Sequence, residues 1–226
     1  SLGSLEALLF LLRQKQIQVV RAGIGVITKK EIYIANSLPE ENRAILGFNS
    51  ELSEDILPED MKSVKVITDK VVYKLIENFE KWRAQKQLEV ERKKLEELPS
   101  IAKISILDFV FRNTSPAIFG IKVEGGVLRQ NLEMINDDDK KIARVKAIQA
   151  DKTSVQKAEK DKEVAISMPG VNFERELKVG EFLYTNLSEF QFRKFKEYRD
   201  FLSSEEKSVL QEIATIKRRK EVTWGI

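Results

Sequence analysis

Apolar residues in the first 68 positions alternate between helical and strand-like spacing. Leucines at positions 5, 8, 9 and 12 form a stripe that predicts a first helix. Strands are predicted over 16–20 (QIQVV), 44–49 (AILGFN) and 64–68 (VKVIT). Thr28 and Glu31 form a capping-box pattern that opens a short helix, and another short helix is predicted over 53–62. This alternation is typical of an α/β fold, so we expect a small parallel sheet covered by helices.

Residues 69–99 are predicted to form one long helix whose apolar stripe stops halfway. The stripe consists of Val71, Val72, Leu75, Ile76, Phe79 and Trp82. Beyond it the helix is polar on all sides, which is typical of a helix that bridges solvent, pairs with another helix or is unstable. Leu88 and Leu95 are seven residues apart, but lysines occupy the preceding equivalent positions. A coiled coil is therefore poorly supported, and pairs such as Glu89 and Lys93 can hold a single exposed helix.

After Pro99 the apolar pattern changes to a period of two. Short strand-like segments separated by turn residues follow each other as far as position 187, without helices between them. This spacing predicts a closed β-barrel, in which the acidic run NDDDKK (136–141) is a hairpin tip and Phe119 a core residue. Aromatic residues from Phe192 to Phe201, and a capping box at Ser203 and Glu206, then predict a helical hairpin. The expected organisation is an α/β domain (1–68), a connecting helix (69–99), an all-β barrel (100–187) and a C-terminal hairpin and tail (188–226).

The amino-acid composition excludes several kinds of catalytic and metal-binding site. The 226 residues include no Cys and no His, so Ser-His and Cys-His nucleophiles and the usual zinc ligand sets are not available. No G-x-x-x-x-G-K-[ST] phosphate loop occurs, and NDDDKK lacks the spacing of a calcium loop. We therefore expect no enzyme activity, cofactor or metal in this chain. The lack of Cys and of a long apolar run fits a cytoplasmic protein without a membrane partner, and the net charge of +3 is compatible with RNA.

Several stretches of the chain, in order, resemble translation initiation factor 5B in its archaeal form. SLGSLEAL, AGIGVIT, AILGFN and DKVVYKLIENFEKW resemble its third domain and connecting helix. FVFRNTSPAIFGIKVEGGVLRQNLEMI, KAIQADKTSVQKAEKDKEVAISMPGV and IKRRKEVTWGI resemble its fourth domain. The resemblance implies a fragment that acts, as a monomer, on ribosomal subunits and initiator methionyl-tRNA. GTP and Mg would belong to a GTPase domain absent here, and the first strand of the third domain is also expected to be missing.

The resemblance further implies a barrel similar to the second domain of elongation factors, which contacts the aminoacylated acceptor end of the tRNA. The long helix would pack on the α/β domain with its first half and span solvent with its second. The hairpin 147–155 and the strand that begins near 160 are expected to line the pocket. The expected contacts are Gln149, Asp151, Lys152, Glu163, Val164 and Ala165. Without the resemblance, the same hairpin is an ordinary solvated turn.

Two other groups of charged residues have alternative interpretations. Arg112 either reaches a tRNA phosphate or pairs with Glu124 or Glu133, and cross-strand pairs of opposite charge are the ordinary arrangement. The C-terminal helices carry basic residues followed by a tryptophan: Arg193, Lys194, Lys196, Arg199, Lys217, Arg218, Arg219, Lys220 and Trp224. In the family this region faces the ribosome and, in eukaryotes, initiation factor 1A. The alternative is a solvated basic face with Trp224 packed on the hairpin.

Two rival functions remain at this point. The first is a protein-interaction module that binds another initiation factor or a ribosomal protein and has no specific tRNA pocket. The second is a hydrolase that uses paired carboxylates such as Glu124 and Glu133, which no motif supports. Binding that depends on the methionyl group of the tRNA would separate the first rival from the favoured function.

Overall fold

The structure is a computed structural model that describes residues 1–226. The chain divides into two compact units, Ser1–Arg92 and Lys93–Ile226. A single helix, α3 (Val72–Glu96), contains the boundary between them. None of the helices is both long enough and apolar enough to cross a membrane.

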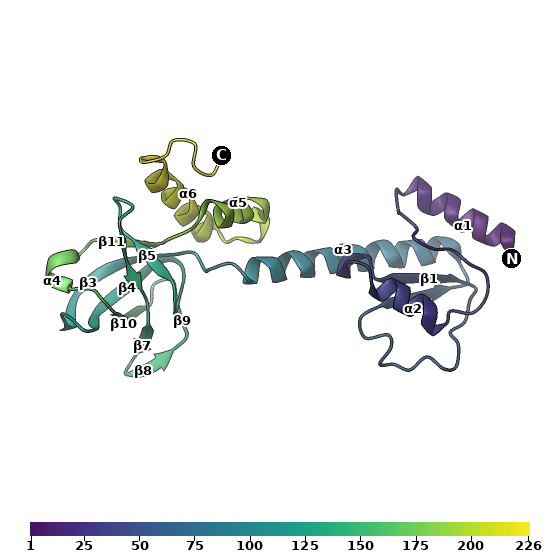
Figure 1. The fold of residues 1–226 in the computed structure, drawn as a ribbon, viewed down its shortest axis with the longest axis horizontal. Helices are drawn as coiled ribbons and strands as arrows, with labels where there is room; N and C mark the ends of the chain where they lie inside the picture. The colour runs from purple at the N-terminus through teal and green to yellow at the C-terminus, as the bar shows by residue number, and fades with distance from the viewer. The chain divides into compact units, whose positions relative to one another are not determined.

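The first unit is a two-stranded parallel sheet with helices on both faces. Its other elements are α1 (Leu2–Gln14), α2 (Lys29–Asn36), the short 3₁₀ helix η1 (Glu40–Asn42), β1 (Ala44–Phe48) and β2 (Lys65–Asp69). The strand register runs from Ala44 opposite Lys65 to Phe48 opposite Asp69, so the predicted parallel pairing is confirmed. Leu12 of α1 and Leu75 of α3 pack on one face with Ile67. Figure 1 shows α2 on the other side of β1.

The predicted capping box of α2 is present. The Glu31 carboxylate accepts hydrogen bonds from the backbone N–H of Thr28, at 3.0 Å, and from its hydroxyl group. These bonds, together with the nearby Arg21 guanidinium, hold the pKa of Glu31 below its ordinary value, with the hydroxyl contact as the largest cause. The helix therefore begins where the sequence pattern places it.

The predicted strand over 16–20 is wrong. Gln16 takes a left-handed conformation, with φ of 56°, two residues after the end of α1, and the following residues pair with no strand. A cavity of about 780 Å³ is lined by both this segment and β1. A strand needs a neighbour to satisfy its backbone groups, and β1 pairs only with β2. The strand-like sequence therefore remains an irregular connection.

The predicted helix over 53–62 is also wrong. Pro58 lies at its centre and disfavours helical geometry in the preceding residue. The segment instead forms successive tight turns, and the Asp60 side chain accepts a hydrogen bond from the N–H of Leu57 at 2.9 Å. The turns bring Val64, which is buried beside α2, to the start of β2.

The long helix α3 is confirmed, and its burial follows the apolar stripe. Asp69 Oδ1 accepts from the backbone N–H of Val71 at 2.8 Å just before the helix begins. Leu75, Ile76 and Phe79 are buried, whereas residues 83–94 include no buried side chain. Side chains on this polar part pair along the helix, as Lys86 does with Glu89 at 3.3 Å. Burial resumes near the C-terminal end, where Leu95 and Leu98 pack against the C-terminal helices.

The second unit is a strongly curled, mainly antiparallel sheet. Its strands are β3 (Ala102–Arg112), β4 (Ala117–Arg129), β5 (Glu133–Ile135), β6 (Lys141–Arg144), β7 (Ala147–Ala150), β8 (Thr153–Val155), β9 (Lys157–Glu159), β10 (Glu163–Met168) and β11 (Phe182–Thr185). Their order is β6-β5-β11-β3-β4-β10-β7-β8, with β9 beside β4. Phe119 is fully buried and its ring centre lies 5.1 Å from that of Phe173, which confirms its predicted place in the core.

The expectation of a closed barrel is only partly met. The strands at the two ends of the order, β6 and β8, do not pair with each other. Instead, the chain crosses from one side to the other after β6. There the N–H of Val145 donates to Leu132 O at 2.9 Å, and the N–H of Lys146 donates to Ser167 O at 2.8 Å. Because this connection supplies single bonds in place of a ladder, the sheet curls into a partial barrel.

The C-terminal helices pack on β5 and β11, as Figure 1 shows. They are α5 (Glu189–Glu197), the 3₁₀ helix η2 (Arg199–Phe201) and α6 (Ser204–Arg218), and a short helix α4 (Phe173–Glu176) precedes them. The Ser203–Glu206 capping box is confirmed by reciprocal bonds of 2.9 and 3.1 Å. Glu212 of α6 accepts from Tyr184 Oη at 2.9 Å and from Lys103 Nζ at 2.7 Å. Burial and this carboxylate raise the pKa of the Tyr184 hydroxyl.

Candidate nucleic-acid interface

A row of three paired residues runs across the outer face of β4, β10 and β7. In the strand register Gly120 lies opposite Ala165, and Ala165 lies opposite Gln149. Neighbours such as Phe119 and Ile166 point the other way, into the core, because side chains alternate along a strand. The sheet thus brings two of the expected site residues, Gln149 and Ala165, side by side. Gly120 itself is buried, because Phe109 and Leu107 of β3 pack against its outer side.

The aromatic side chain of Phe109, on the neighbouring strand β3, borders this row. A side chain at position 120 would meet Phe109 Cβ at 3.1 Å, so Phe109 of β3 lies directly beside the Gly120 surface. The Phe109 side chain is 61% exposed, and Phe111, two residues on, is 68% exposed. Exposed aromatic rings beside small residues form a platform on which a planar base can stack.

Sequence reasoning missed the role that these two phenylalanines can play. The pattern FVFRN predicts a strand, with no separate role for its two phenylalanines. The available signal was three consecutive large apolar residues, because a strand with one core face cannot bury all three. Register shifts in the β3–β4 pairing between Ile106 and Arg112 decide which ones face outward, and the sequence does not show them.

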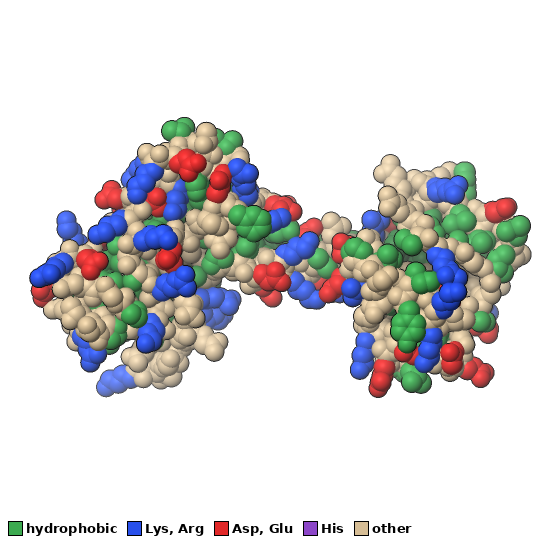
Figure 2. Space-filling view, in the orientation of Figure 1, with side chains coloured by type: hydrophobic (Ala, Val, Ile, Leu, Met, Phe, Trp, Pro, Cys, Tyr) green, Lys and Arg blue, Asp and Glu red, His purple; other side chains and the backbone are tan.

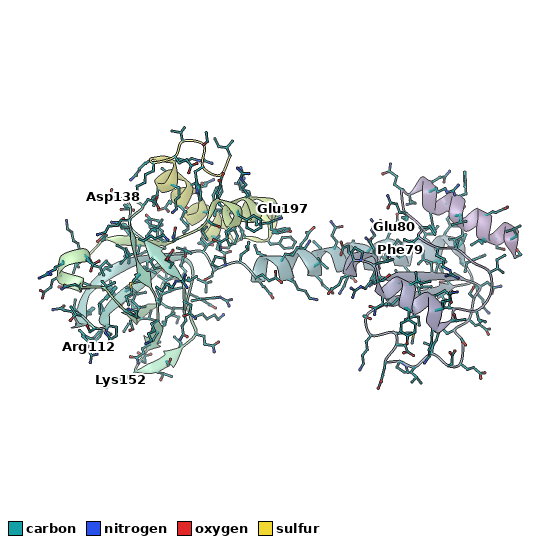
Figure 3. The ribbon with its side chains drawn as sticks, in the orientation of Figure 1. Phe79, Glu80, Arg112, Asp138, Lys152 and Glu197 are labelled. Carbon is teal, nitrogen blue, oxygen red and sulfur yellow. The ribbon has the colours of Figure 1, made fainter.

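The hairpin between β7 and β8 is confirmed, and it presents Asp151 and Lys152 at its tip. Both residues have positive φ, 49° and 64°, as a two-residue hairpin turn of the type I′ kind requires. Both side chains are exposed and neither makes an ion pair. Figure 3 shows Lys152 and Arg112 at the same end of the β unit, away from Asp138.

Strand β10 supplies the remaining expected residues in different ways. The Val164 side chain is buried in the core, while the Glu163 side chain is exposed at the start of the strand. Ser167 O accepts a bond from the β7 side, so alternate residues, including Glu163, direct their backbone groups to that side. The pairing between β10 and β7 ends at Ala165, so the backbone N–H of Glu163 lies beyond the last paired residue. The backbone N–H of Val164 points to the other side, toward β4.

The structure does not form the predicted pair between Arg112 and a glutamate. Arg112 lies at the far end of β3, opposite Ile118, and its side chain is exposed without an ion pair. Glu124 accepts from Ser105 Oγ at 2.7 Å, and Glu133 accepts from Asn186 Nδ2 at 2.5 Å. Strands β11 and β3 lie between the two glutamates, so they do not form a carboxylate pair either.

Many of the C-terminal basic residues already have partners within the chain. Lys217 Nζ of α6 lies 2.6 Å from Asp139 Oδ1, and Lys220 Nζ, just after this helix, lies 3.6 Å from Asp139 Oδ2. Arg218 donates to Trp224 O at 2.9 Å, and Arg219 donates to Asp137 O at 3.0 Å. These contacts tie the C-terminal tail and the β5–β6 hairpin to α6.

The other members of this group lie on α5, in η2 or in the tail. Arg193 and Lys194 pair with Glu189 and Glu197, at 2.6 and 2.7 Å, on the exposed side of α5. Trp224 is only 7% exposed, and its ring centre lies 4.7 Å from that of Phe192. Trp224 thus packs on the helical hairpin, as the alternative interpretation predicted. Figure 2 shows blue basic side chains scattered over the second unit with red acidic ones among them.

No group of three or more Asp or Glu side chains is arranged to hold a metal ion. The outer face and the hairpin tip of the second unit offer exposed rings, two cations without ion pairs (Arg112 and Lys152) and two exposed carboxylates (Asp151 and Glu163).

Two family models match the chain. Residues 99–184, which contain the curled sheet, match the model described as elongation factor Tu domain 4. Residues 1–80, which contain the α/β unit, match the model described as translation-initiation factor 2. Both families are translation factors, so the two units of the chain are translation-factor domains.

Relatives and a solved structure narrow this class. The chain is 37% identical to the probable translation initiation factor IF-2 of Methanoculleus marisnigri and 36% identical to that of Ignicoccus hospitalis, in both cases over all of this chain. It resembles the crystal structure of GDP-bound aIF5B from Aeropyrum pernix, with a TM-score of 0.56 and 33% identity over 97% of this chain. The chain belongs to the archaeal IF-2/aIF5B family of translation initiation factors. It spans 38–39% of the length of these proteins.

Proposed function

We propose that this chain is the part of an archaeal translation initiation factor that binds the aminoacylated acceptor end of initiator tRNA. The binding surface is the outer face of β3, β4, β10 and β7 together with the β7–β8 tip. The observation that carries the proposal is the row from Phe109 through Gly120 and Ala165 to Gln149. The relatives, which are named as initiation factors, support the general role.

The chemistry of an acceptor end matches this face. The terminal adenine can stack on an exposed ring such as Phe109, because aromatic rings stack on bases without needing a particular sequence. The small side chain of Ala165 leaves room for the flexible thioether of methionine. Glu163 can accept a hydrogen bond from the amino group or a ribose hydroxyl. Arg112 and Lys152, which have no ion pairs, can face phosphates at the two sides of the slot.

Coupling to GTP hydrolysis, and the role in subunit joining, belong to the longer protein. GTP and Mg²⁺ would bind in a domain outside this chain, and the long helix α3 would transmit its state to the β unit. Residues 83–94 of α3 carry no buried side chain, so the helix itself must supply the stiffness. Placing Gly-Pro at positions 87 and 88 of a full-length factor should uncouple subunit joining from GTP hydrolysis. Unchanged coupling, measured by light scattering and phosphate release, would remove the lever from the proposal.

The test of the tRNA proposal is equilibrium binding of this chain to initiator tRNA, with and without methionine, at two salt concentrations. We expect the charged form to bind more tightly. Phe109→Ala should weaken it by about tenfold, in line with about 1–3 kcal/mol for a base stacked on an aromatic ring. Ala165→Leu should reduce the preference for the charged form. Phe190→Ala is the matched control, because Phe190 is 68% exposed but lies on α5.

Two outcomes would contradict the proposal. Equal affinity for charged and uncharged tRNA, with strong salt dependence and no effect of Phe109→Ala, would reduce the interaction to nonspecific attraction. Absence of tRNA binding, combined with capture of a ribosomal protein or another initiation factor, would favour the protein-interaction module instead.

A further inference from the structure

The outer edge of β2 is an unpaired sheet edge beside a groove. Strand β2 pairs with β1 on one side only. The N–H of Lys65 donates to Arg43 O at 2.8 Å, and Asp69 O accepts from Asn49 N–H at 2.9 Å, both toward the β1 side. Because backbone groups alternate along a strand, those of Val66 and Thr68 point the other way. No hydrogen bond reaches them, so four backbone groups are available at this edge.

The groove lies between this edge and one side of α3. It has a volume of about 470 Å³ and is lined by residues 65–68 of β2 and by Asn78, Lys81, Trp82 and Gln85 of α3. Trp82 is half-buried and offers an apolar surface, while the amides of Asn78 and Gln85 offer donors and acceptors. An added strand would therefore have hydrogen-bonding groups on one side and helix side chains above it.

The charges around the groove have one sign. Lys65 and Lys81 line it, and none of the lining residues is acidic. Lys65 makes no ion pair. Lys81 pairs with Glu77 at 2.7 Å, but both side chains are more than 60% exposed, and such pairs contribute little. The groove thus favours an occupant with carboxylates.

We propose that β2 and α3 form a docking site for an extended acidic peptide segment of a partner protein, which adds a third strand to the sheet at β2. Main-chain bonds to Val66 and Thr68 supply the pairing, one peptide side chain packs on Trp82, and peptide carboxylates face Lys65 and Lys81. This is the strand-addition mode of peptide recognition. RNA matches the site less well, because a sugar-phosphate backbone cannot continue a strand ladder. The proposal is independent of the tRNA surface on the other unit.

The experiment titrates the full 226-residue chain with a labelled peptide of about seven residues that alternates Val and Thr between terminal glutamates. Amide NMR signals should shift at Val66 and Thr68 and not at Ala44 and Leu46 on the opposite edge. Val66→Pro removes an outward N–H without touching the β1 ladder, and should weaken binding at least tenfold. Lys65→Glu and Lys81→Glu should each weaken it several-fold. Lys74→Glu, an exposed change on α3 outside the groove, is the matched control.

A second peptide keeps the test independent of protein folding. The same sequence with alternate backbone amides N-methylated retains its charge and side chains but cannot pair, and should not bind. Equal binding of the methylated peptide, shifts at the β1 edge, or no binding of either peptide would overturn the proposal. Equal competition by a single-stranded RNA would reduce the site to a cationic surface. Concentration-dependent self-association that Val66→Pro abolishes would replace the peptide by a second copy of the chain.

Discussion

Two hairpin tips of the β unit have similar sequences and opposite surroundings. The β5–β6 tip contains Asp137–Asp139, and the β7–β8 tip contains Asp151 and Lys152. Asp139 and Asp151 even share a left-handed conformation, with φ of 56° and 49°. Figure 3 shows Asp138 and Lys152 at different ends of the unit. Only the first tip is near the C-terminal helices.

The β5–β6 tip is fixed from within and from outside. The Asn136 side chain accepts bonds from the N–H groups of Asp138 and Lys140 at 3.1 and 3.0 Å. Lys217 then approaches Asp139 while donating to Asn186 Oδ1 at 2.7 Å. The carboxylate contact has the geometry of an ion pair without a hydrogen bond, and both side chains are less than 20% exposed. The β7–β8 tip has no such partners, so its charges remain available for a ligand.

This comparison shows why charged turns cannot be sorted into structural and functional ones by composition. Sequence patterns predicted both hairpins correctly. Whether a charge serves the fold depends on what packs over the turn, and α6 arrives from more than 60 residues further along the chain. The three predictions that follow test this contrast, beginning with the largest expected effect.

The largest effect is expected on stability. Asp139→Asn keeps the shape and tolerates the left-handed conformation, but leaves Lys217 in a poorly solvated place without its counter-charge. We expect a loss of about 2 kcal/mol for the second unit. Asp151→Asn, the matched change on the exposed tip, should stay within about 0.5 kcal/mol. Urea unfolding followed by Trp224 fluorescence, in a Trp82→Phe background, measures the second unit alone. Equal losses for both variants would show that the Asp139 tip is not fixed by its ion pair.

A smaller effect is expected on tRNA binding. Lys152→Ala removes a free cation from the exposed tip, so it should lower affinity several-fold and reduce the slope of log K against log salt by about 1. Lys220→Ala removes a lysine of similar exposure whose charge is already opposed by Asp139, and should change the slope much less. Filter binding at several salt concentrations provides both slopes. A larger change for Lys220 would place the RNA contact on the C-terminal helices.

The smallest effect concerns pH at the fixed end. The hydrogen bond from Asn186, and then Lys141, hold the pKa of Glu133 below its ordinary value of 4.5. A carboxylate with a lowered folded-state pKa stabilises the protein above its unfolded-state pKa, and this contribution is lost as pH falls through the folded-state value. Glu133→Gln should therefore make stability less dependent on pH below about 4.5, as measured by urea unfolding of the second unit at several pH values. An unchanged pH profile would mean that other carboxylates control acid unfolding.

Much of the fold could be predicted because local patterns and caps agree with it. The Thr28–Glu31 and Ser203–Glu206 boxes fix two helix starts, and the stripe ending at Trp82 marks where α3 stops being buried. The two wrong predictions lie where the local pattern is overridden, in one case by the lack of a neighbouring strand and in the other by a proline. Residues 16–20 have a strand sequence but no neighbouring strand, and Pro58 breaks the predicted helix over 53–62.

Only part of the candidate site could be predicted from the sequence. The hairpin over 147–155 could be placed on β7 and β8 by resemblance, and the charged tip followed from the turn. The slot beside it depends on register, because only pairing shows that Gly120, Ala165 and Gln149 form one row. Phe109 joins this row through an irregular stretch of β3 that no local pattern announces.

The sequence by itself determined the elements, their order and the family of this protein, because helix stripes, caps, strand alternation and family motifs are properties of neighbouring residues. Tertiary structure alone decided which charges are free. Lys217 and Lys152 are both lysines in polar surroundings of the chain, yet one is bound between Asp139 and Asn186 and the other faces solvent. The physical reason is that the energy of a charge depends on its neighbours in space and its exposure to water, and these are set by packing.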